Sequence, residues 1–203
     1  LTGFKYIAEV VKRNEATGEF VCGGEESYGF LAETFCRDKD AVSAISLMAE
    51  ACAWAKSKGM DFQGLLQDIY LKNGFSREVG ISVVRPGKTG ADEIQAMMKD
   101  FRANPPRQLG DSDVVTVKDY DTLEVRDMRA GTTAKLDMPV TSNVLQFFTE
   151  DGSKVSIRPS GTEPKIKFYI EVKAPMPTVA DYDKAIALAD EKIEAVKRSL
   201  KIS

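Results

Sequence analysis

Apolar and polar residues alternate most regularly between Lys165 and Lys173. The apolar positions are Ile166, Phe168, Ile170 and Val172, and the polar positions around them are Lys165, Lys167, Tyr169, Glu171 and Lys173. A period of two residues places successive side chains on opposite faces of a β-strand. The pattern therefore predicts a strand with one buried face and one basic, polar face.

A shorter alternation precedes this strand. Val155 and Ile157 are apolar, whereas Ser156 and Arg158 share the opposite parity. Between the two alternating segments lies a polar loop, Arg158-Pro-Ser-Gly-Thr-Glu-Pro164. We therefore expect a buried face and a basic, hydroxyl-rich face to run along the chain on both sides of this loop.

Two other segments repeat their apolar residues at helical spacing. The first, which follows Asp40, has the stripe Ala41, Ile45, Met48, Cys52 and Ala55, and we expect that stripe to be buried core. The last helix of the chain has the stripe Tyr182, Ala185, Ala189, Ile193, Val196 and Leu200. This helix is predicted to lie on the sheet and to leave the polar loop open.

The order of the predicted elements favours two domains. Helical and strand-like segments are mixed up to residue 105, which is typical of an α/β domain. Strand-like runs then follow at 114–117, 123–125 and 144–148, and with the strands around the polar loop they predict a four- or five-stranded sheet. Because Asn104-Pro-Pro-Arg107 breaks the preceding helix, we expect domains at 1–105 and 106–203.

Charge and hydropathy argue against two classes of partner. The formal net charge is −3 and the isoelectric point is about 5.3, whereas a nucleic-acid-binding surface needs an excess of basic residues. No apolar run approaches the roughly 20 residues that a membrane-spanning helix needs. We therefore expect neither a nucleic-acid partner nor a membrane association.

The cysteine and histidine content restricts the chemistry. Cys22, Cys36 and Cys52 are spread out and form no CxxC pair, so neither a disulfide framework nor a zinc site is indicated, and a reducing cytoplasm fits best. The chain contains no histidine, which excludes catalysis by an imidazole of this chain. Acid and base roles would fall to Lys, Glu, Asp or Tyr.

The loop 158–164 has the composition of an anion-binding site. Arg158 offers a planar fork of donors, Ser160 and Thr162 offer hydroxyl groups, and Gly161 allows successive backbone N–H groups to point at one oxyanion. Lys167 is on the same polar face of the next strand. The alternative is an ordinary β-turn that uses proline and glycine for its geometry, and the spacing alone leaves both interpretations open.

A second polar loop, Gly23-Gly-Glu-Glu-Ser-Tyr-Gly29, brings together acidic side chains and a hydroxyl group. Glu25, Glu26 and Ser27 in this loop suit the vicinal hydroxyl groups of a sugar. The alternative is a strand-to-helix connection whose acidic residues favour the next helix N-terminus. The charged segment Arg37-Asp-Lys-Asp40 could likewise be a solvated helix terminus.

These motifs resemble those of one family. Arg158-Pro-Ser-Gly-Thr-Glu-Pro164, followed by Lys165-Ile-Lys-Phe-Tyr-Ile170, is similar to the phosphate-binding loop in the last domain of the α-D-phosphohexomutases, the phosphoglucomutase and phosphomannomutase superfamily. The resemblance implies that the phosphate not undergoing transfer is held by Arg158, Ser160, Gly161, Thr162 and Lys167.

The N-terminal motifs resemble the third domain of the same family. Gly24-Glu-Glu-Ser-Tyr-Gly29 is similar to its sugar-binding loop, which implies that Glu25 and Ser27 bind hexose hydroxyl groups. Arg37-Asp-Lys-Asp40 resembles the segment that places a lysine in the active site, so Lys39 is the implied catalytic residue. Thr2-Gly-Phe-Lys5 is similar to a further family segment and makes Thr2 a candidate ligand near the sugar.

The resemblance also implies an architecture. It covers nearly the whole chain and predicts the later part of the third domain followed by the complete fourth domain. The expected fold class is α/β plus α+β, in which a partial three-layer α/β sugar-binding domain precedes a small antiparallel sheet domain. That second domain is expected to resemble the TATA-box-binding protein and to carry helices on one face.

The implied activity is the interconversion of hexose 1-phosphate and hexose 6-phosphate, with glucose or mannose as the sugar. The family works through a phosphoserine and a bisphosphate intermediate, with Mg²⁺ as metal and glucose 1,6-bisphosphate as activator. Neither a Thr-Ala-Ser-His-Asn-Pro serine loop nor an Asp-Gly-Asp metal loop occurs in this sequence. We therefore expect the chain to need the N-terminal domains of a longer enzyme and to be inactive alone. The alternative is a non-catalytic phosphosugar-binding module.

Overall fold

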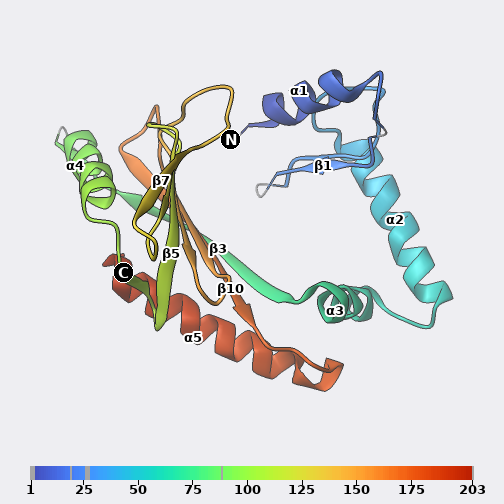
Figure 1. The fold of residues 1–203 in the computed structure, drawn as a ribbon. Helices are drawn as coiled ribbons and strands as arrows, with labels where there is room; N and C mark the ends of the chain where they lie inside the picture. Colours follow the sequence, from blue (N-terminus) through green and yellow to red (C-terminus); the bar gives the residue numbers. More distant parts are fainter. Residues whose placement is uncertain (1–2, 19, 26–27, 88, 203) are drawn as a thin grey trace. The chain divides into compact units, whose positions relative to one another are not determined.

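The computed structural model describes residues 3–18, 20–25, 28–87 and 89–202 (Figure 1). Its backbone divides into two compact units, Leu1–Asp68 and Ile69–Ser203. The first unit contains α1 (Phe4–Asn14), β1 (Gly23–Gly24), β2 (Phe30–Leu31) and α2 (Ala41–Ser57). A third helix, α3 (Phe62–Asn73), includes the division between the units.

The second unit is built on one antiparallel sheet. In space its strands follow the order β3-β10-β9-β8-β5-β6-β7, and β4 pairs with β5. The strands are β3 (Phe75–Val84), β4 (Gln108–Leu109), β5 (Ser112–Asp119), β6 (Glu124–Asp127), β7 (Thr132–Lys135), β8 (Leu145–Thr149), β9 (Lys154–Pro159) and β10 (Lys165–Ala174). The helical elements are α4 (Gly90–Ala103), the short 3-10 helix η1 (Val179–Asp181) and α5 (Tyr182–Leu200).

The core of the second unit lies on the apolar face of the sheet, as the alternation predicts. Ile157 on β9 and Phe168 on β10 are fully buried and are direct partners in the strand register. The α5 stripe Ala185, Ala189, Ile193, Val196 and Leu200 is buried in the same cluster. From α4, Phe101 contacts Phe147 and Phe168, each with ring centroids 6.2 Å apart. The predicted antiparallel sheet with helices on one face is therefore confirmed, but the predicted number of four or five strands is too low, because the described sheet also includes β3 and short strands.

The two units differ from the predicted segments 1–105 and 106–203. Strand β3 pairs with β10 along its entire length, from Phe75 opposite Ala174 to Val84 opposite Lys165. Helix α4 contributes the fully buried Met98 to the same core. Both elements therefore belong to the second unit. The strand that pairs with β3 lies about 90 positions away in the chain, a pairing that local sequence cannot reveal.

The predicted burial of the α2 stripe is wrong. Only Ala55 is buried, whereas Ile45 is 70% exposed and Met48 is 51% exposed. Val42 and Trp54, on other sides of the helix, are also exposed. Apolar residues thus surround this helix, and the described part of the first unit leaves them uncovered. None of the described helices is suited by its length and composition to cross a bilayer.

A polar network fixes the end of α4 in the second unit. Arg102 donates from Nε to Oδ2 of Asp119 at 3.1 Å and from Nη2 to Oδ1 of Asn143 at 2.6 Å. The second carboxylate oxygen of Asp119 accepts a hydrogen bond from the backbone N–H of Asp121 at 3.0 Å. Asp119 is only 3% exposed, so its charge depends on these partners.

Replacing Asp119 should therefore be costly. We expect Asp119→Ala to lower the free energy of unfolding by about 3 to 5 kcal/mol, because it removes the buried charge partner of Arg102 and leaves only the more distant, exposed Asp121. Urea denaturation measures the change. Asp121→Ala is the matched control, since Asp121 is exposed and 3.6 Å from Arg102, and it should cost less than about 1 kcal/mol. Equal losses in the two variants would contradict the importance of the buried pair.

Candidate functional site

Two basic side chains stand next to each other on the polar face of the sheet. The register pairs Arg158 on β9 directly with Lys167 on β10, and Lys167 in turn with Ser82 on β3. Directly paired residues in an antiparallel sheet point to the same face. Both cations are half-buried, and among the described residues neither forms an ion pair with a carboxylate. Two adjacent cations without a counter-ion favour the binding of an anion.

The loop after Arg158 presents backbone donors. Ser160 closes it, because its N–H donates to the carbonyl oxygen of Lys165 at 2.8 Å. The hydroxyl oxygen of Ser160 accepts from the N–H groups of Thr162 and Glu163, at 3.4 and 3.3 Å. These bonds are long, so the two N–H groups converge on one oxygen without holding it tightly. The same geometry suits an oxygen of a bound anion.

Gly161 leaves room at the surface of the loop. Its φ lies outside the left-handed region, so the turn itself does not require glycine at this position. A Cβ built on Gly161 would meet no atom within 4 Å. The missing side chain therefore opens the backbone of the loop to close approach from outside the chain.

The carboxylate of the loop is already occupied. Glu163 forms an ion pair with Lys165. The hydrogen bond that Lys165 donates in this pair lowers the pKa of Glu163, and the charge of Lys167 lowers it further. Because Lys165 engages Glu163, the positive charges of Arg158 and Lys167 are the ones that a ligand would meet.

In the first unit, the structure brings Glu25 and Lys39 together over Gly29. The N–H of Glu25 donates to the carbonyl oxygen of Gly29 at 2.8 Å, which closes the loop between β1 and β2. A Cβ on Gly29 would lie 2.6 Å from Cδ of Lys39 and 2.7 Å from Oε2 of Glu25. A side chain at position 29 would therefore displace the ends of Lys39 and Glu25, two predicted site residues that are distant in sequence but meet here.

The surroundings of Lys39 keep it charged. Its Nζ donates to Oδ1 of Asp38 at 2.8 Å and lies 5.3 Å from the ring centroid of Phe4. The hydrogen bond with Asp38 raises the pKa of Lys39, and the charges of Asp38 and Glu25 act in the same direction. A lysine that stays an ammonium ion is suited to stabilise negative charge rather than to accept a proton.

The structure describes most of the predicted site residues and divides them between the two units. Thr2 and Ser27 lie outside the described residues. Glu25 and Lys39 belong to the first unit, whereas Arg158, Ser160, Gly161, Thr162 and Lys167 belong to the second. Sequence reasoning misses the contacts of Phe4 and Asp38 with Lys39. The only available signal is the position of Asp38 immediately before Lys39.

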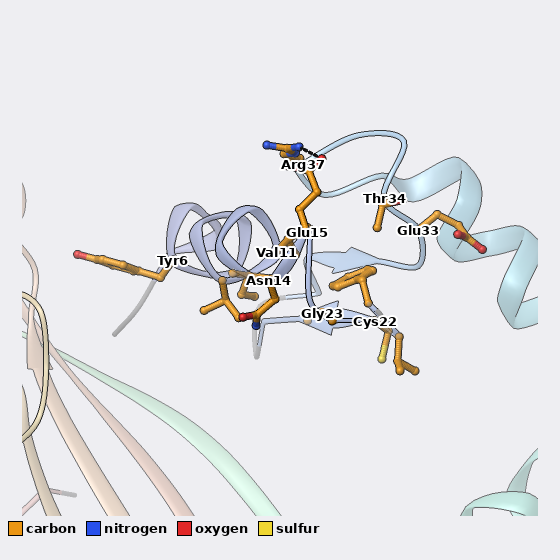
Figure 2. A pocket seen from close by; sticks show the side chains of 15 residues that line it. Tyr6, Val11, Asn14, Glu15, Cys22, Gly23, Glu33, Thr34 and Arg37 are labelled. Carbon is orange, nitrogen blue, oxygen red and sulfur yellow. Dashed lines mark hydrogen bonds and ion pairs between the residues drawn. The ribbon is translucent and has the colours of Figure 1, made fainter.

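A cavity of about 840 Å³ lies beside α1 in the first unit (Figure 2). Its lining is largely apolar and includes Val10, Val11 and Val21. An ion pair of 2.6 Å between Arg37 and Glu15 lies in its wall, as the dashed line in Figure 2 shows. Of the predicted site residues that the structure describes, none lines this cavity, so the cavity does not extend the cluster around Lys39.

The described side chains show whether this part of the chain could hold a metal ion. Within the part of the chain that the structure describes, no group of three or more His, Cys, Asp or Glu residues is placed to hold a metal ion. The Mg²⁺ that the family resemblance implies therefore does not fit the described residues of this chain.

The charge state of Lys39 can be measured directly. We expect Asp38→Asn to lower the pKa of Lys39, because it removes the strongest interaction with the ammonium group. A pH titration of ¹³C-labelled lysine side chains by NMR follows this change. Glu25→Gln is the matched control and should lower the pKa less, since Glu25 acts only through its more distant charge. A larger effect from Glu25→Gln would contradict the dominance of the Asp38 contact.

The comparisons with known proteins agree with the motifs. Two family profiles match, "Phosphoglucomutase/phosphomannomutase, alpha/beta/alpha domain III" over residues 1–72 and "Phosphoglucomutase/phosphomannomutase, C-terminal domain" over residues 81–189. A phosphoglucomutase of Staphylococcus aureus is 38% identical over 175 residues, which are 86% of this chain and 31% of the relative. A phosphoglucomutase of Staphylococcus saprophyticus is 35% identical over 175 residues, covering 85% of this chain and 31% of that protein.

A solved structure shares the fold. The open form of the exocytosis-sensitive phosphoprotein pp63/parafusin, a phosphoglucomutase of Paramecium, aligns with a TM-score of 0.62 at 19% sequence identity. The alignment covers 99% of this chain and 33% of that chain. The chain thus spans about a third of the length of these relatives. Because one profile alone matches more than half of its residues, the chain belongs to the phosphoglucomutase/phosphomannomutase family.

Proposed function

We propose that the chain is the sugar- and phosphate-binding portion of a phosphohexomutase that interconverts hexose 1-phosphate and hexose 6-phosphate. The sugar is glucose, mannose or both, and the reaction passes through a phosphoserine and a bisphosphate intermediate. The observation that carries the proposal is the pair Arg158 and Lys167, two adjacent cations that lack a carboxylate partner among the described residues and lie beside the backbone donors of the loop.

The proposed roles follow from the chemistry of each group. Arg158 offers two parallel donors to phosphate oxygens, and Lys167 adds a compact positive charge beside them. Ser160, Gly161 and Thr162 complete this phosphate cradle with hydroxyl groups and an accessible backbone. We define the phosphate cradle as Arg158, Ser160, Gly161, Thr162 and Lys167.

In the first unit, Glu25 would accept hydrogen bonds from sugar hydroxyl groups, with Ser27 and Thr2 as further proposed ligands. Lys39, which Asp38 keeps protonated, would stabilise the negative charge of the phosphoryl group during transfer. Glu25 and Lys39 lie together over Gly29, so the two segments that carry them can present an acceptor and a cation to the same substrate.

Turnover would need the remainder of the longer enzyme. Phosphoryl transfer depends on a positioned nucleophile and on charge neutralisation at the transferring group. This sequence contains neither the serine loop nor the metal loop of the family, so both are proposed to lie in another part of the parent enzyme. Glucose 1,6-bisphosphate would likewise act on the complete enzyme.

The cradle should bind phosphate weakly in this chain. We expect inorganic phosphate to shift the backbone amide signals of Gly161 and Thr162 in an NMR titration, with a dissociation constant on the order of 1 mM. Arg158→Ala should abolish these shifts, and Arg158→Lys should restore only part of the affinity, because an ammonium group lacks the bidentate fork.

Arg129→Ala is the matched control for charge. Arg129 is exposed and pairs with Glu150 in another part of the sheet, so its loss should leave the titration unchanged. Two results would indicate that the loop is an ordinary β-turn and not a phosphate site. One is a set of signal shifts that does not include residues 158–167, and the other is an Arg158→Ala protein that titrates like the unmodified chain.

We also propose a covering partner for the exposed apolar surface of α2. Val42, Ile45 and Trp54 are between 51% and 76% exposed, although a helix with apolar residues on all sides is normally enclosed by other elements. The relatives are about three times as long as this chain, because it covers 31% of their length. The occupant is therefore proposed to be the part of the parent enzyme that this chain lacks.

If such a partner covers α2, the loss of stability caused by Ile45→Ala should differ between this chain and the full-length parent. In this chain, Ile45→Ala should change the free energy of unfolding by less than about 0.5 kcal/mol, because the side chain is already exposed. In the full-length parent it should cost about 2 to 5 kcal/mol, as for a buried isoleucine. Phe168→Ala is the control and should be destabilising in both proteins. Equal, small losses from Ile45→Ala in both would contradict the proposed cover.

A further inference from the structure

The polar face of the sheet continues beyond the phosphate cradle. One pleat away from Arg158 and Lys167, the register pairs Ser156 on β9 with Tyr169 on β10 and with Gln146 on β8. These side chains share the face of the two cations, because alternate residues of a strand point to the same side. In the next row, Lys154 and Glu171 form an ion pair of 2.7 Å. The three uncharged side chains Gln146, Ser156 and Tyr169 therefore lie between the row of the cradle and a pair whose charges already compensate each other; Lys118 on β5 continues their row beyond Gln146.

Hydrogen bonds orient this row. The hydroxyl group of Tyr120 donates to Oε1 of Gln146 at 2.7 Å, and Nε2 of Gln146 donates to Oγ of Ser156 at 2.9 Å. Burial raises the pKa of Tyr120, so its hydroxyl group keeps the proton that it donates. Gln146 thus accepts from Tyr120 and donates to Ser156, which fixes the orientation of its amide group.

The series ends at Ser156 with an available donor. Its oxygen accepts from Gln146, and among the described residues its own proton is donated to no acceptor. Ser156 is half-buried and lies two positions from Arg158, about 7 Å along the strand. In a series of hydrogen bonds each member polarises the next, which strengthens the terminal hydroxyl group as a donor.

We propose that Ser156, positioned by Gln146 and Tyr120, is a subsite for the sugar oxygens of a hexose phosphate whose phosphate group lies in the cradle. This inference rests on the proposed function. A neutral, oriented hydroxyl donor next to a phosphate site suits an oxygen of the ring or of a ring hydroxyl group. Inorganic phosphate carries no sugar, so it would contact the cradle but not Ser156.

The two ligands therefore separate the subsite from the cradle. NMR titrations of the complete chain with inorganic phosphate should shift the signals of Gly161 and Thr162. Glucose 1-phosphate should shift these and also the backbone amide of Ser156 and the side-chain amide of Gln146. Shifts at the cradle with both ligands, and at Ser156 and Gln146 with neither, would overturn the subsite and leave the proposed function intact. If neither ligand affects residues 158–167, the proposed function fails first and the subsite fails with it.

Variants give a second measurement. Ser156→Ala should weaken glucose 1-phosphate binding about three- to tenfold, the loss expected for one neutral hydrogen bond, and should leave inorganic phosphate binding unchanged. Ser156→Thr should restore the affinity because it keeps the hydroxyl group. Tyr120→Phe should cause a smaller loss for the sugar phosphate alone, since it removes only the first donor of the series.

Thr133→Ala removes an exposed hydroxyl group on the edge strand β7 and should change neither affinity. If Ser156→Ala weakens both ligands equally, Ser156 supports the fold of the cradle and does not contact the sugar. If it weakens neither, Ser156 takes no part in binding. Both results would overturn the proposal.

Discussion

The register between β9 and β10 is the constraint on which the second unit depends. It pairs Ile157 with Phe168 on the buried face and Arg158 with Lys167 on the opposite face. A slip of one residue would exchange the two faces of a strand, so the apolar side chains would leave the core and the cations would enter it. Burial of the apolar residues therefore also fixes the position of the two cations. The proposed phosphate site needs no separate scaffold, because the hydrophobic core already determines where Arg158 and Lys167 lie.

The two units use positive charge in different ways. Lys39 is paired with Asp38 and stacked on Phe4, so its ammonium group is held in place before any ligand arrives. Arg158 and Lys167 have no carboxylate partner among the described residues, so a bound anion would compensate their repulsion. A positioned cation such as Lys39 is suited to stabilise negative charge that develops during a reaction. Two cations without a counter-ion are suited to bind a group that carries a permanent negative charge, such as phosphate. This contrast agrees with the proposed division between phosphoryl transfer and phosphate binding.

The sequence predicts what depends on local periodicity. The alternation through Lys165 to Lys173 correctly places Phe168 in the core and Lys167 on the polar face, and the α5 stripe is buried as expected. Motif spacing also correctly indicates the family.

Contacts between segments that are far apart in the sequence cannot be predicted in this way. The pairing of β3 with β10 joins segments far apart in the chain, and the exposure of Ile45 on α2 depends on which elements are available to cover the helix. The meeting of Glu25 and Lys39 over Gly29 is visible only in three dimensions.

We propose that Arg158 and Lys167 together form a phosphate site that the fold builds in advance. A crystal structure of this chain grown in the presence of phosphate can show whether they do. We expect tetrahedral density on the polar face of the sheet, with phosphate oxygens about 2.7 to 3.2 Å from the guanidinium of Arg158 and the ammonium of Lys167. Phosphate bound elsewhere while this position holds only water, or an Arg158 side chain turned to a carboxylate of the chain, would contradict it.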